Sequence, residues 1–401
     1  MELLKTIFSA TYWMQLDECV SERATGIRLR EALRTLSNKS MVVSTLALRF
    51  SLCKLSSVAE GDTKKEIMLA LGLDKDSKLK TCYADVKDTL SRLHEVDVIF
   101  LNKMYVNYTD DVDANFITNS SEAFGVQVDK VGFNYPKYAA SFINKWVDTA
   151  TYKRISDIVD HNDIDRNSSI LLLSAAYFKV TWEFPFDIRL TRDMKFHYID
   201  HNIIYIPMMT RTESFMFFDD KNNNLKVVEI KLGLRGSSIT IIMPQSMRGL
   251  PALLRRFSNE PDLLKRLKQQ LRYSYIKVVL PRFKIKTGFD LTGLLHKYSL
   301  KQIFNKTNSD LFGMLNHNKT AKQNAWYLSR AKTKNFVILD EMGIFRHIQD
   351  VRIPLLPGPQ LPKGLSLTEF IADRPFYFTV NLNPSPEVDY ELFHGVYYGP
   401  E

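Results

Sequence analysis

Cysteine, metal-ligand spacings and catalytic motifs are all scarce in this sequence. It has three cysteines in 401 residues, Cys19, Cys53 and Cys82. An odd number without metal-ligand spacing indicates neither a disulfide framework nor a zinc site, so buried or unpaired thiols are expected. The chain also lacks G-x-S-x-G, H-E-x-x-H, C-x-x-C and a phosphate-cradling glycine loop. We therefore expect no enzyme activity, no catalytic residue, no metal and no cofactor.

Long apolar runs and interdomain linkers are also missing. No run of about 18 apolar residues occurs, which excludes a membrane-spanning helix. No Pro/Gly/Ser-rich stretch or composition shift divides the chain, so we expect one domain over 1–401 with an N-terminal extension of uncertain role at 1–24. Met1–Met14 is apolar but interrupted by polar residues, and it does not support a signal peptide.

Asn-x-Ser/Thr acceptors favour, if weakly, an extracellular glycoprotein, because such sites matter only in a secreted protein. They open at Asn38, Asn107, Asn119, Asn167, Asn305 and Asn318.

The chain is basic. Fifty-four Lys and Arg against 45 Asp and Glu give a net charge of +9. This excess favours acidic partners such as polyanionic glycans, nucleic acid or anionic membrane, and it specifies none of them.

The apolar pattern changes from helical to β along the chain. Thr63–Glu66 predicts the capping-box start of a short helix that ends at Gly72, and Ser77–Leu93 predicts a second helix. Short apolar or alternating runs predict strands at Val96–Val106, Ile170–Val180, Ile203–Pro207, Leu225–Lys231, Ile239–Met243, Tyr275–Leu280, Phe283–Lys286, Asn335–Leu339 and Phe376–Leu382. Ile170–Val180 is apolar on both faces, as a central strand is. Helices followed by strands with distant partners predict an α+β architecture.

The stretch from Gly343 to Leu367 follows neither pattern. It contains Pro354, Pro357, Pro359 and Pro362, a density that forbids regular structure over much of its length. A long structureless loop in a compact domain is usually functional or disordered.

Segments around this loop resemble the motifs of the serpins, the serine-protease-inhibitor superfamily. The loop is followed by Phe370-Ile371-Ala372-Asp373-Arg374-Pro375-Phe376-Tyr377-Phe378, which is similar to the family's C-terminal signature. Other similar segments, in the family's order, are Asn144-Lys145-Trp146-Val147 with Thr151 and Ile155, Tyr177-Phe178-Lys179 with Trp182, Glu183, Pro185 and Phe186, Pro207-Met208-Met209, Leu280-Pro281-Arg282-Phe283, and Phe393 with Gly395.

The resemblance implies the serpin fold, with three β-sheets, about nine helices and an exposed C-terminal reactive loop at 343–367. It also implies the family's mechanism. A protease attacks the loop as substrate, the cleaved loop inserts as a new central strand of the main sheet, and the acyl-enzyme is carried across the molecule and distorted. The implied partner is a serine protease, or another protein, bound through the loop. We expect a monomer without a nucleic-acid partner.

The hinge, where insertion begins, departs from the family. Inhibitory members have E-E-G-T-x-A-A-A there, because small side chains insert without clashes or buried charge. Aligned on Lys334, Phe336 and Gly343, this chain has Glu341, Met342, Gly343, Ile344, Phe345, Arg346, His347 and Ile348. In the family's register Ile344, Arg346 and Ile348 face the core, and an unpaired buried charge is costly. Insertion is therefore expected to be slow or incomplete.

The bait position is also unusual. Fifteen residues counted from Gly343 lead to Pro357-Gly358 as the candidate reactive bond, and proline suits few serine proteases at a cleavage site. Other candidates are Arg352, Leu355, Leu356 and Lys363.

A polar cluster under the main sheet of the family is largely replaced. The family's S-P-x-S-I-S is here Ser44-Thr45-Leu46-Ala47-Leu48, and Ser174, Val180 and Thr333 stand where the family has Asn, Gly and His. Three interpretations remain open: relaxed selection for sheet opening, a substitute polar set, or neutral drift in a working inhibitor.

Some serpins bind heparin-like glycans through a basic helical surface, and this chain has a candidate. A helix between Pro261 and Leu271 would carry leucines on one face and basic residues on the other, although a merely solvated basic face is an alternative. The candidate glycan-binding residues are Lys265, Lys268, Arg272, Arg255 and Arg256.

Three functions are therefore weighed. The first is a serpin-type protein that displays a reactive loop to serine proteases and traps them weakly or not at all. The second is a functional suicide-substrate inhibitor with an atypical hinge. The third is a non-inhibitory binding or carrier protein with the same fold, including a glycan-binding one.

Overall fold

The structure is a computed structural model of the chain. It describes residues 39–73, 84, 88, 91, 98–198, 202–233, 236–260, 262–297, 300–316, 326–342, 367–385 and 388–400. These residues group into two compact units. The described part of unit 1 lies within Ser44–Phe178 and Lys286–Phe336, and that of unit 2 within Leu29–Val43, Lys179–Ile285 and Val337–Glu401.

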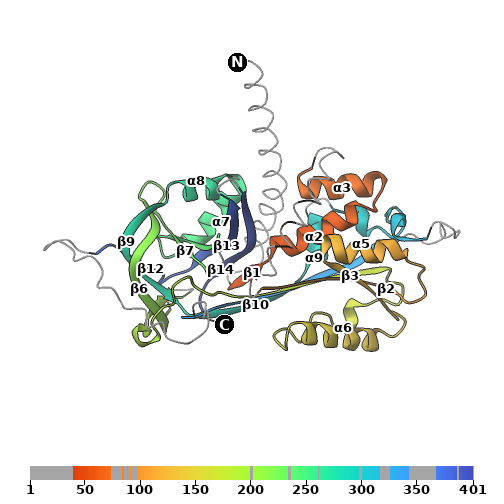
Figure 1. Ribbon diagram of the computed structural model, residues 1–401, viewed down its shortest axis with the longest axis horizontal. Helices are drawn as coiled ribbons and strands as arrows, with labels where there is room; N and C mark the ends of the chain where they lie inside the picture. Colours follow the sequence, from red (N-terminus) through yellow and green to blue (C-terminus); the bar gives the residue numbers. More distant parts are fainter. Residues whose placement is uncertain are drawn as a thin grey trace, which may run out of the picture. The chain divides into compact units, whose positions relative to one another are not determined.

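Unit 1 has a five-stranded sheet of order β10-β11-β4-β2-β3, with helices on both faces (Figure 1). The strands are β2 Val98–Asn107, β3 Val126–Val131, β4 Ile170–Lys179, β10 Phe283–Asp290 and β11 Leu328–Leu339; β4, β10 and β11 also have residues in unit 2. The helices are α2 Thr45–Ser56, α3 Gly61–Leu71, α5 Ala114–Phe124, α6 Pro136–Ala150 and α9 Leu291–Lys297. Short 3-10 turns occupy His161–Asp163, Gln302–Phe304 and Phe312–Met314.

The central strand of this sheet is β4, as its apolar sequence predicts. From Ile170 to Phe178 no residue is more than 2% exposed. On one face Leu171, Leu173 and Ala175 pack with the buried residues of α6, and α2 lies on the other side of the sheet (Figure 1). Both faces of β4 are therefore enclosed by protein.

Asn144 shows why the N-x-W-V segment is needed in α6. Its side-chain Nδ2 donates to the Val159 carbonyl at 2.8 Å, and its Oδ1 accepts from the Ile158 amide at 2.9 Å. At the end of the helix the Thr151 hydroxyl donates to the Val147 carbonyl at 2.7 Å. These bonds fix how the chain leaves α6 and returns toward β4.

Unit 2 has a nine-stranded sheet of order β1-β14-β13-β8-β7-β6-β9-β12, with β5 also paired to β6. The strands are β1 Met41–Val43, β5 Arg192–His197, β6 Ile203–Asp220, β7 Leu225–Lys231, β8 Ser237–Pro244, β9 Arg272–Pro281, β12 Glu369–Ile371, β13 Phe376–Ser385 and β14 Val388–Tyr397. Its helices are α7 Leu250–Asn259 and α8 Leu263–Gln269, with a 3-10 turn at Ile188–Leu190.

The α+β class expected from the sequence is confirmed. The described residues contain seven α-helices, against about nine expected for the whole chain. Their strands form two hydrogen-bonded sheets instead of three, because the 18-residue β6 pairs with β5, β7 and β9 and joins them in one sheet.

Most of the predicted strands are present, but several are longer than expected. The predicted strand at Ile203–Pro207 is the first part of β6, which continues to Asp220. The capping-box prediction is wrong, because α3 begins at Gly61 and has no side-chain cap, whereas the predicted end at Gly72 is confirmed by its left-handed φ of 75°. Of Ser77–Leu93 the structure describes only residues 84, 88 and 91, each of them helical.

Cys53 is buried in α2, as expected, but it is disulfide-bonded, so the expectation of no disulfide is wrong for this residue. No helix in the described part of the chain is long and apolar enough to cross a membrane. Within the same ranges, no group of His, Cys, Asp and Glu could hold a metal ion.

Candidate functional site

The chain enters the predicted reactive loop from a base that is fixed by backbone hydrogen bonds, all within unit 2. The Val180 amide donates to the Ile338 carbonyl at 2.9 Å, and the Trp182 amide donates to the Met342 carbonyl at 3.1 Å. The Trp182 indole Nε1 donates to the Asp340 carbonyl at 2.6 Å. The chain is thus held in place up to Met342, one residue before the hinge glycine.

Glu341 is the buried charge of this base. Its carboxyl Oε1 accepts from the Thr191 hydroxyl at 2.8 Å and lies 3.8 Å from an Arg282 guanidinium nitrogen. The Glu341 side chain is 7% exposed and that of Arg282 is 47% exposed. A carboxylate so enclosed needs such partners, since an unpaired buried charge is strongly unfavourable.

Asp340 contributes a second, shielded carboxylate. Its Oδ1 accepts from the Met342 amide at 3.0 Å, and its Oδ2 lies 3.4 Å from the Lys179 ammonium. Both acidic groups at the base of the loop therefore have partners within the protein.

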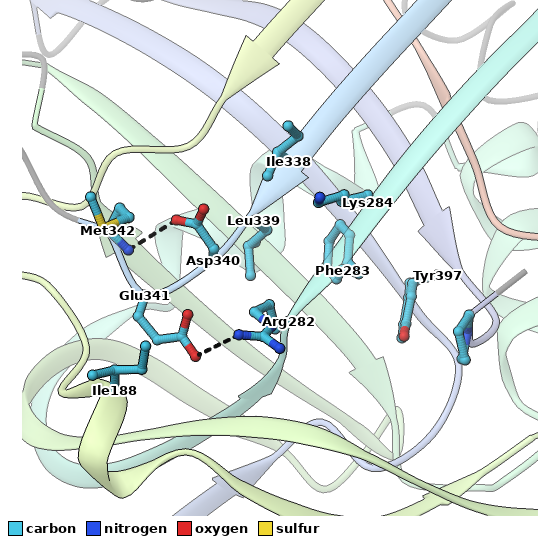
Figure 2. A pocket seen from close by; sticks show the side chains of 11 residues that line it. Ile188, Arg282, Phe283, Lys284, Ile338, Leu339, Asp340, Glu341, Met342 and Tyr397 are labelled. Atoms are coloured by element: carbon cyan, nitrogen blue, oxygen red, sulfur yellow. Dashed lines mark hydrogen bonds and ion pairs between the residues drawn. The ribbon is translucent and has the colours of Figure 1, made fainter. Parts of the chain in front are cut away.

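A pocket of about 710 Å³ opens beside this base. Figure 2 shows the side chains of Arg282 and Glu341 pointing toward one another. The lining residues come from four parts of unit 2: Ile188, Arg282, Phe283, Lys284, Ile338, Leu339, Asp340, Glu341, Met342, Tyr397 and Pro400.

The far end of the loop is fixed as firmly as its beginning. β12 pairs in parallel with β9, with Phe370 opposite Val278. Lys277 contributes two contacts, because its amide donates to the Thr368 carbonyl at 3.0 Å and its ammonium lies 2.9 Å from the Glu369 carboxylate. Residues 343–366 thus connect two anchored points of unit 2.

Of the predicted hinge, Glu341 and Met342 belong to the described base. The other hinge residues, Gly343, Ile344, Phe345, Arg346, His347 and Ile348, lie outside the described residues. The candidate bait residues Arg352, Leu355, Leu356, Pro357, Gly358 and Lys363 lie outside them as well.

Two hydrogen bonds join polar side chains at the polar positions of the five-stranded sheet. The buried Ser174 hydroxyl donates to Asn102 Oδ1 at 2.8 Å, and the buried Asn335 Nδ2 donates to the Thr333 hydroxyl at 3.4 Å. Asn335 Oδ1 is enclosed without a hydrogen-bond partner. Ser44 has a different role, because its hydroxyl accepts from the Ala47 amide and caps α2.

The structure separates the candidate glycan-binding residues. The helix expected to present Lys265, Lys268 and Arg272 on one face ends at Gln269, so Arg272 is the first residue of β9 and not part of α8. Lys268 is 14% exposed and lies 3.8 Å from Glu229, and Arg256 pairs with Glu260 at 3.0 Å. Lys265, Arg255 and Arg272 are exposed. Fewer cations are therefore available to an anion than the sequence suggests.

Two of the glycosylation acceptors, Asn119 and Asn167, are exposed in unit 1. Asn107 and Asn305 are partly buried, whereas Asn38 and Asn318 lie outside the described ranges.

Sequence reasoning missed the residues that hold the loop base, namely Lys179, Thr191 and Arg282. A signal was present, because two of these lie in the family-like segments Tyr177-Phe178-Lys179 and Leu280-Pro281-Arg282-Phe283. These segments served only to identify the fold, although they converge on Asp340–Met342 in space.

A family model described as "Serpin (serine protease inhibitor)" matches residues 21–400. The Antitrypsin of Bombyx mori is 25% identical over 370 residues, which cover 90% of each chain. The crystal structure of Serpin48, a highly specific serpin of the insect Tenebrio molitor, has a TM-score of 0.80 and 25% identity over 96% of this chain and 98% of that one. Native protease nexin-1 with heparin has a TM-score of 0.80 and 21% identity over 96% and 99%, and shows likeness of fold alone.

Proposed function

The chain belongs to the serpin family, and on this premise we propose that it displays residues 343–367 to serine proteases while trapping them weakly or not at all. The proposal has two parts. Display is supported by the two fixed ends of the loop, at Met342 and at β12. Weak trapping is supported by the hinge sequence.

The observation that carries the proposal is Arg346 in the hinge, at a position where inhibitory members have a small residue. A strand inserted next to β4 would lie in the same enclosed layer, since β4 is at most 2% exposed from Ile170 to Phe178. A guanidinium taken into that layer without a partner would oppose insertion by roughly several kcal/mol. Ile344 and Ile348, on the same face of the inserted strand, add bulk to this barrier.

Contacts across the five-stranded sheet oppose opening as well. β4 and β11 are direct neighbours, so the space for a new strand has to be made. Two lysines of β11 make ion pairs: Lys334 lies 2.8 Å from Asp157, and Lys332 pairs with Asp163. Both aspartates belong to the segment that follows α6. Widening the sheet would therefore strain two ion pairs together with the β4–β11 ladder.

Incubation with trypsin, chymotrypsin and elastase, followed by denaturing gels, tests trapping directly. We expect clean cleavage between residues 343 and 367 without an SDS-resistant complex. A covalent complex in good yield would instead establish the competent inhibitor with an atypical hinge. The melting temperature of the cleaved protein is the companion measurement, and we expect a small rise, because a large one would mean that the loop inserts despite Arg346.

Two matched variants locate the barrier. Arg346→Ala is expected to increase the melting temperature after cleavage, because it removes the charge from the face that enters the core in the family's register. His347→Ala should leave it unchanged, since the neighbouring side chain points the other way. An equal change in melting temperature after cleavage in the two variants would show that a buried Arg346 is not what opposes insertion.

A second candidate function, glycan binding, is favoured by the exposure of Lys265, Arg255 and Arg272 in a protein of net charge +9. The heparin of the protease nexin-1 structure belongs to that protein, and for this chain the exposed basic residues are the argument. We expect salt-sensitive retention on heparin that falls in a Lys265→Gln/Arg272→Gln variant. Retention that survives these substitutions would exclude this surface. Lys195→Gln, an exposed lysine on β5, is the control.

We further propose an extracellular location, supported by the disulfide at Cys53, because disulfides persist in oxidising compartments. Peptide mapping of secreted protein tests this, with glycans expected at the exposed Asn119 and Asn167.

A further inference from the structure

The pocket beside the loop base has the dimensions of a small-molecule site. Its volume of about 710 Å³ lies within the range of roughly 300–1,000 Å³ that is common for ligand pockets. Its lining is provided by three anchored backbone segments, at 282–284, 338–342 and 397–400, together with Ile188. The fold therefore holds its shape independently of residues 343–366.

The pocket lining has more positive charge than its own carboxylates neutralise. Asp340 is paired with Lys179, and Glu341 accepts from Thr191 and has Arg282 at 3.8 Å. The Arg282 side chain is 47% exposed, so part of its guanidinium is accessible to solvent. Lys284 is exposed on β10, and among the described residues no carboxylate pairs with it. One ammonium and part of one guanidinium are left for an anion.

The rest of the wall is apolar and includes a surface that faces solvent. Ile188 is 66% exposed at the rim. Three other apolar lining residues are buried: Phe283 and Tyr397 stack with ring centroids 4.6 Å apart, and Leu339 is enclosed as well. Ile188 is therefore an exposed apolar surface of the pocket, and a ligand that covers it would remove this surface from water.

We propose that this pocket binds a small amphipathic acid, with its anionic group between Arg282 and Lys284 and its apolar part against the exposed Ile188. The inference goes beyond the display of a bait loop, which requires neither an unpaired lysine nor a hollow beside its base. It also predicts discrimination between ligands, because an apolar molecule without the acid would leave the Lys284 ammonium and part of the Arg282 guanidinium unneutralised.

Two fluorescent probes of matched shape test the site on the full-length folded protein. 8-Anilinonaphthalene-1-sulfonate has an aromatic body and one sulfonate, and N-phenyl-1-naphthylamine has the same rings without the charge. We expect the sulfonate probe to bind one saturable site at least about tenfold more tightly, the difference that one charge-assisted hydrogen bond supplies.

Single substitutions assign the contacts. Lys284→Gln and Arg282→Gln should each weaken the sulfonate probe about tenfold and leave the neutral probe unchanged, whereas Lys195→Gln should affect neither. Ile188→Ser should weaken both probes, and Leu190→Ser, at an exposed neighbour that does not line the pocket, should weaken neither. Lys284, Ile188 and Leu190 are exposed, so their variants retain the folded core, which the melting temperature verifies.

Equal affinity for the two probes would overturn the proposal, and so would sulfonate binding that Lys284→Gln and Arg282→Gln leave intact. Binding of the sulfonate probe to many weak sites without saturation would also overturn the proposal. None of these measurements involves a protease, so they succeed or fail independently of the proposed bait function.

Discussion

At Gly395 the backbone of β14 passes against the ring of Phe378. An added Cβ would lie 2.2 Å from the ring's Cζ, and both positions are buried in the nine-stranded sheet. We expect Gly395→Ala to lower the free energy of unfolding by about 1–3 kcal/mol, the usual cost of overpacking. Denaturant titration measures the change.

Gly293→Ala is the matched control. Gly293 is in α9, and an added Cβ would meet no atom within 4 Å. Because alanine is the better helix former, this variant should be more stable by about 0.5–1 kcal/mol. Two glycine substitutions with equal effects would contradict the contact with Phe378.

Lys54 in α2 is a buried cation that lies over aromatic rings. Its ammonium is 4.2 Å from the ring centroid of Phe116 and 5.2 Å from that of Phe124, and burial lowers the pKa of Lys54 to about 8. The lowered pKa means that the folded state disfavours the proton. The resulting loss of stability is complete below pH 8 and disappears as the pH approaches 10.5, the ordinary value.

We therefore expect Lys54→Met to raise the free energy of unfolding at pH 7 by about 1–2 kcal/mol, because the lost cation–π contact offsets part of the desolvation penalty. The advantage of the variant should shrink between pH 8 and pH 10. An advantage that stays constant over this range would show that packing, and not charge, is responsible.

At the scale of single residues, the sequence could not reveal the buried cation at Lys54 or the disulfide at Cys53. Lys54 and Cys53 are adjacent in an apolar helix, where nothing in the local pattern distinguishes a buried cation or a bonded sulfur. Gly395 could be recognised from its family-like segment. The sequence did not show that the Phe378 ring leaves no room for a side chain there.

Among the elements, α3 shows a local signal that tertiary contacts override. Thr63 and Glu66 have the spacing of a capping box, yet the Thr63 hydroxyl accepts from the Asp310 amide at 3.0 Å. Glu66 Oε2 accepts from the amides of Lys301 and Gln302, each at 2.7 Å. The polar residues of α3 therefore bind a segment more than 200 positions away.

Glu66→Ala should lower the free energy of unfolding by about 1–3 kcal/mol, because two backbone amides would lose their charged acceptor. Lys65→Ala, on the same helix, is the control and should change it by about 0.5 kcal/mol or less, because the ion pair of Lys65 with Asp62 is exposed. Thermal unfolding compares the variants, and equal midpoints would count against a Glu66 contact that stabilises the fold.

Strand existence was predictable, whereas strand length was not. The apolar run of β4 identified a central strand to within one residue. In β6 the polar stretch Thr210–Glu213 breaks the alternation on which strand prediction depends, although the backbone ladder to β9 continues through it. The pocket could not be predicted at all, since its walls come from segments between Ile188 and Pro400 that no local pattern connects.

For the molecule as a whole, the bond at Cys53 links stability to redox conditions. A disulfide typically contributes about 2–4 kcal/mol. Protein refolded with reductant should melt several degrees lower than protein refolded without it. Cys53→Ser should melt at the lower temperature under both conditions, and a reductant effect that persists in this variant would place the sensitivity elsewhere.

The position of β13 has a consequence for a chain that is cut once between residues 343 and 367. β13 lies between β14 and β8 in the middle of the nine-stranded sheet, and β12 is paired with β9. The C-terminal fragment would remain bound through these ladders, so the nicked protein would elute from a sizing column as the intact one does. Its refolding after denaturation, however, would become a bimolecular reaction, with a rate that depends on protein concentration.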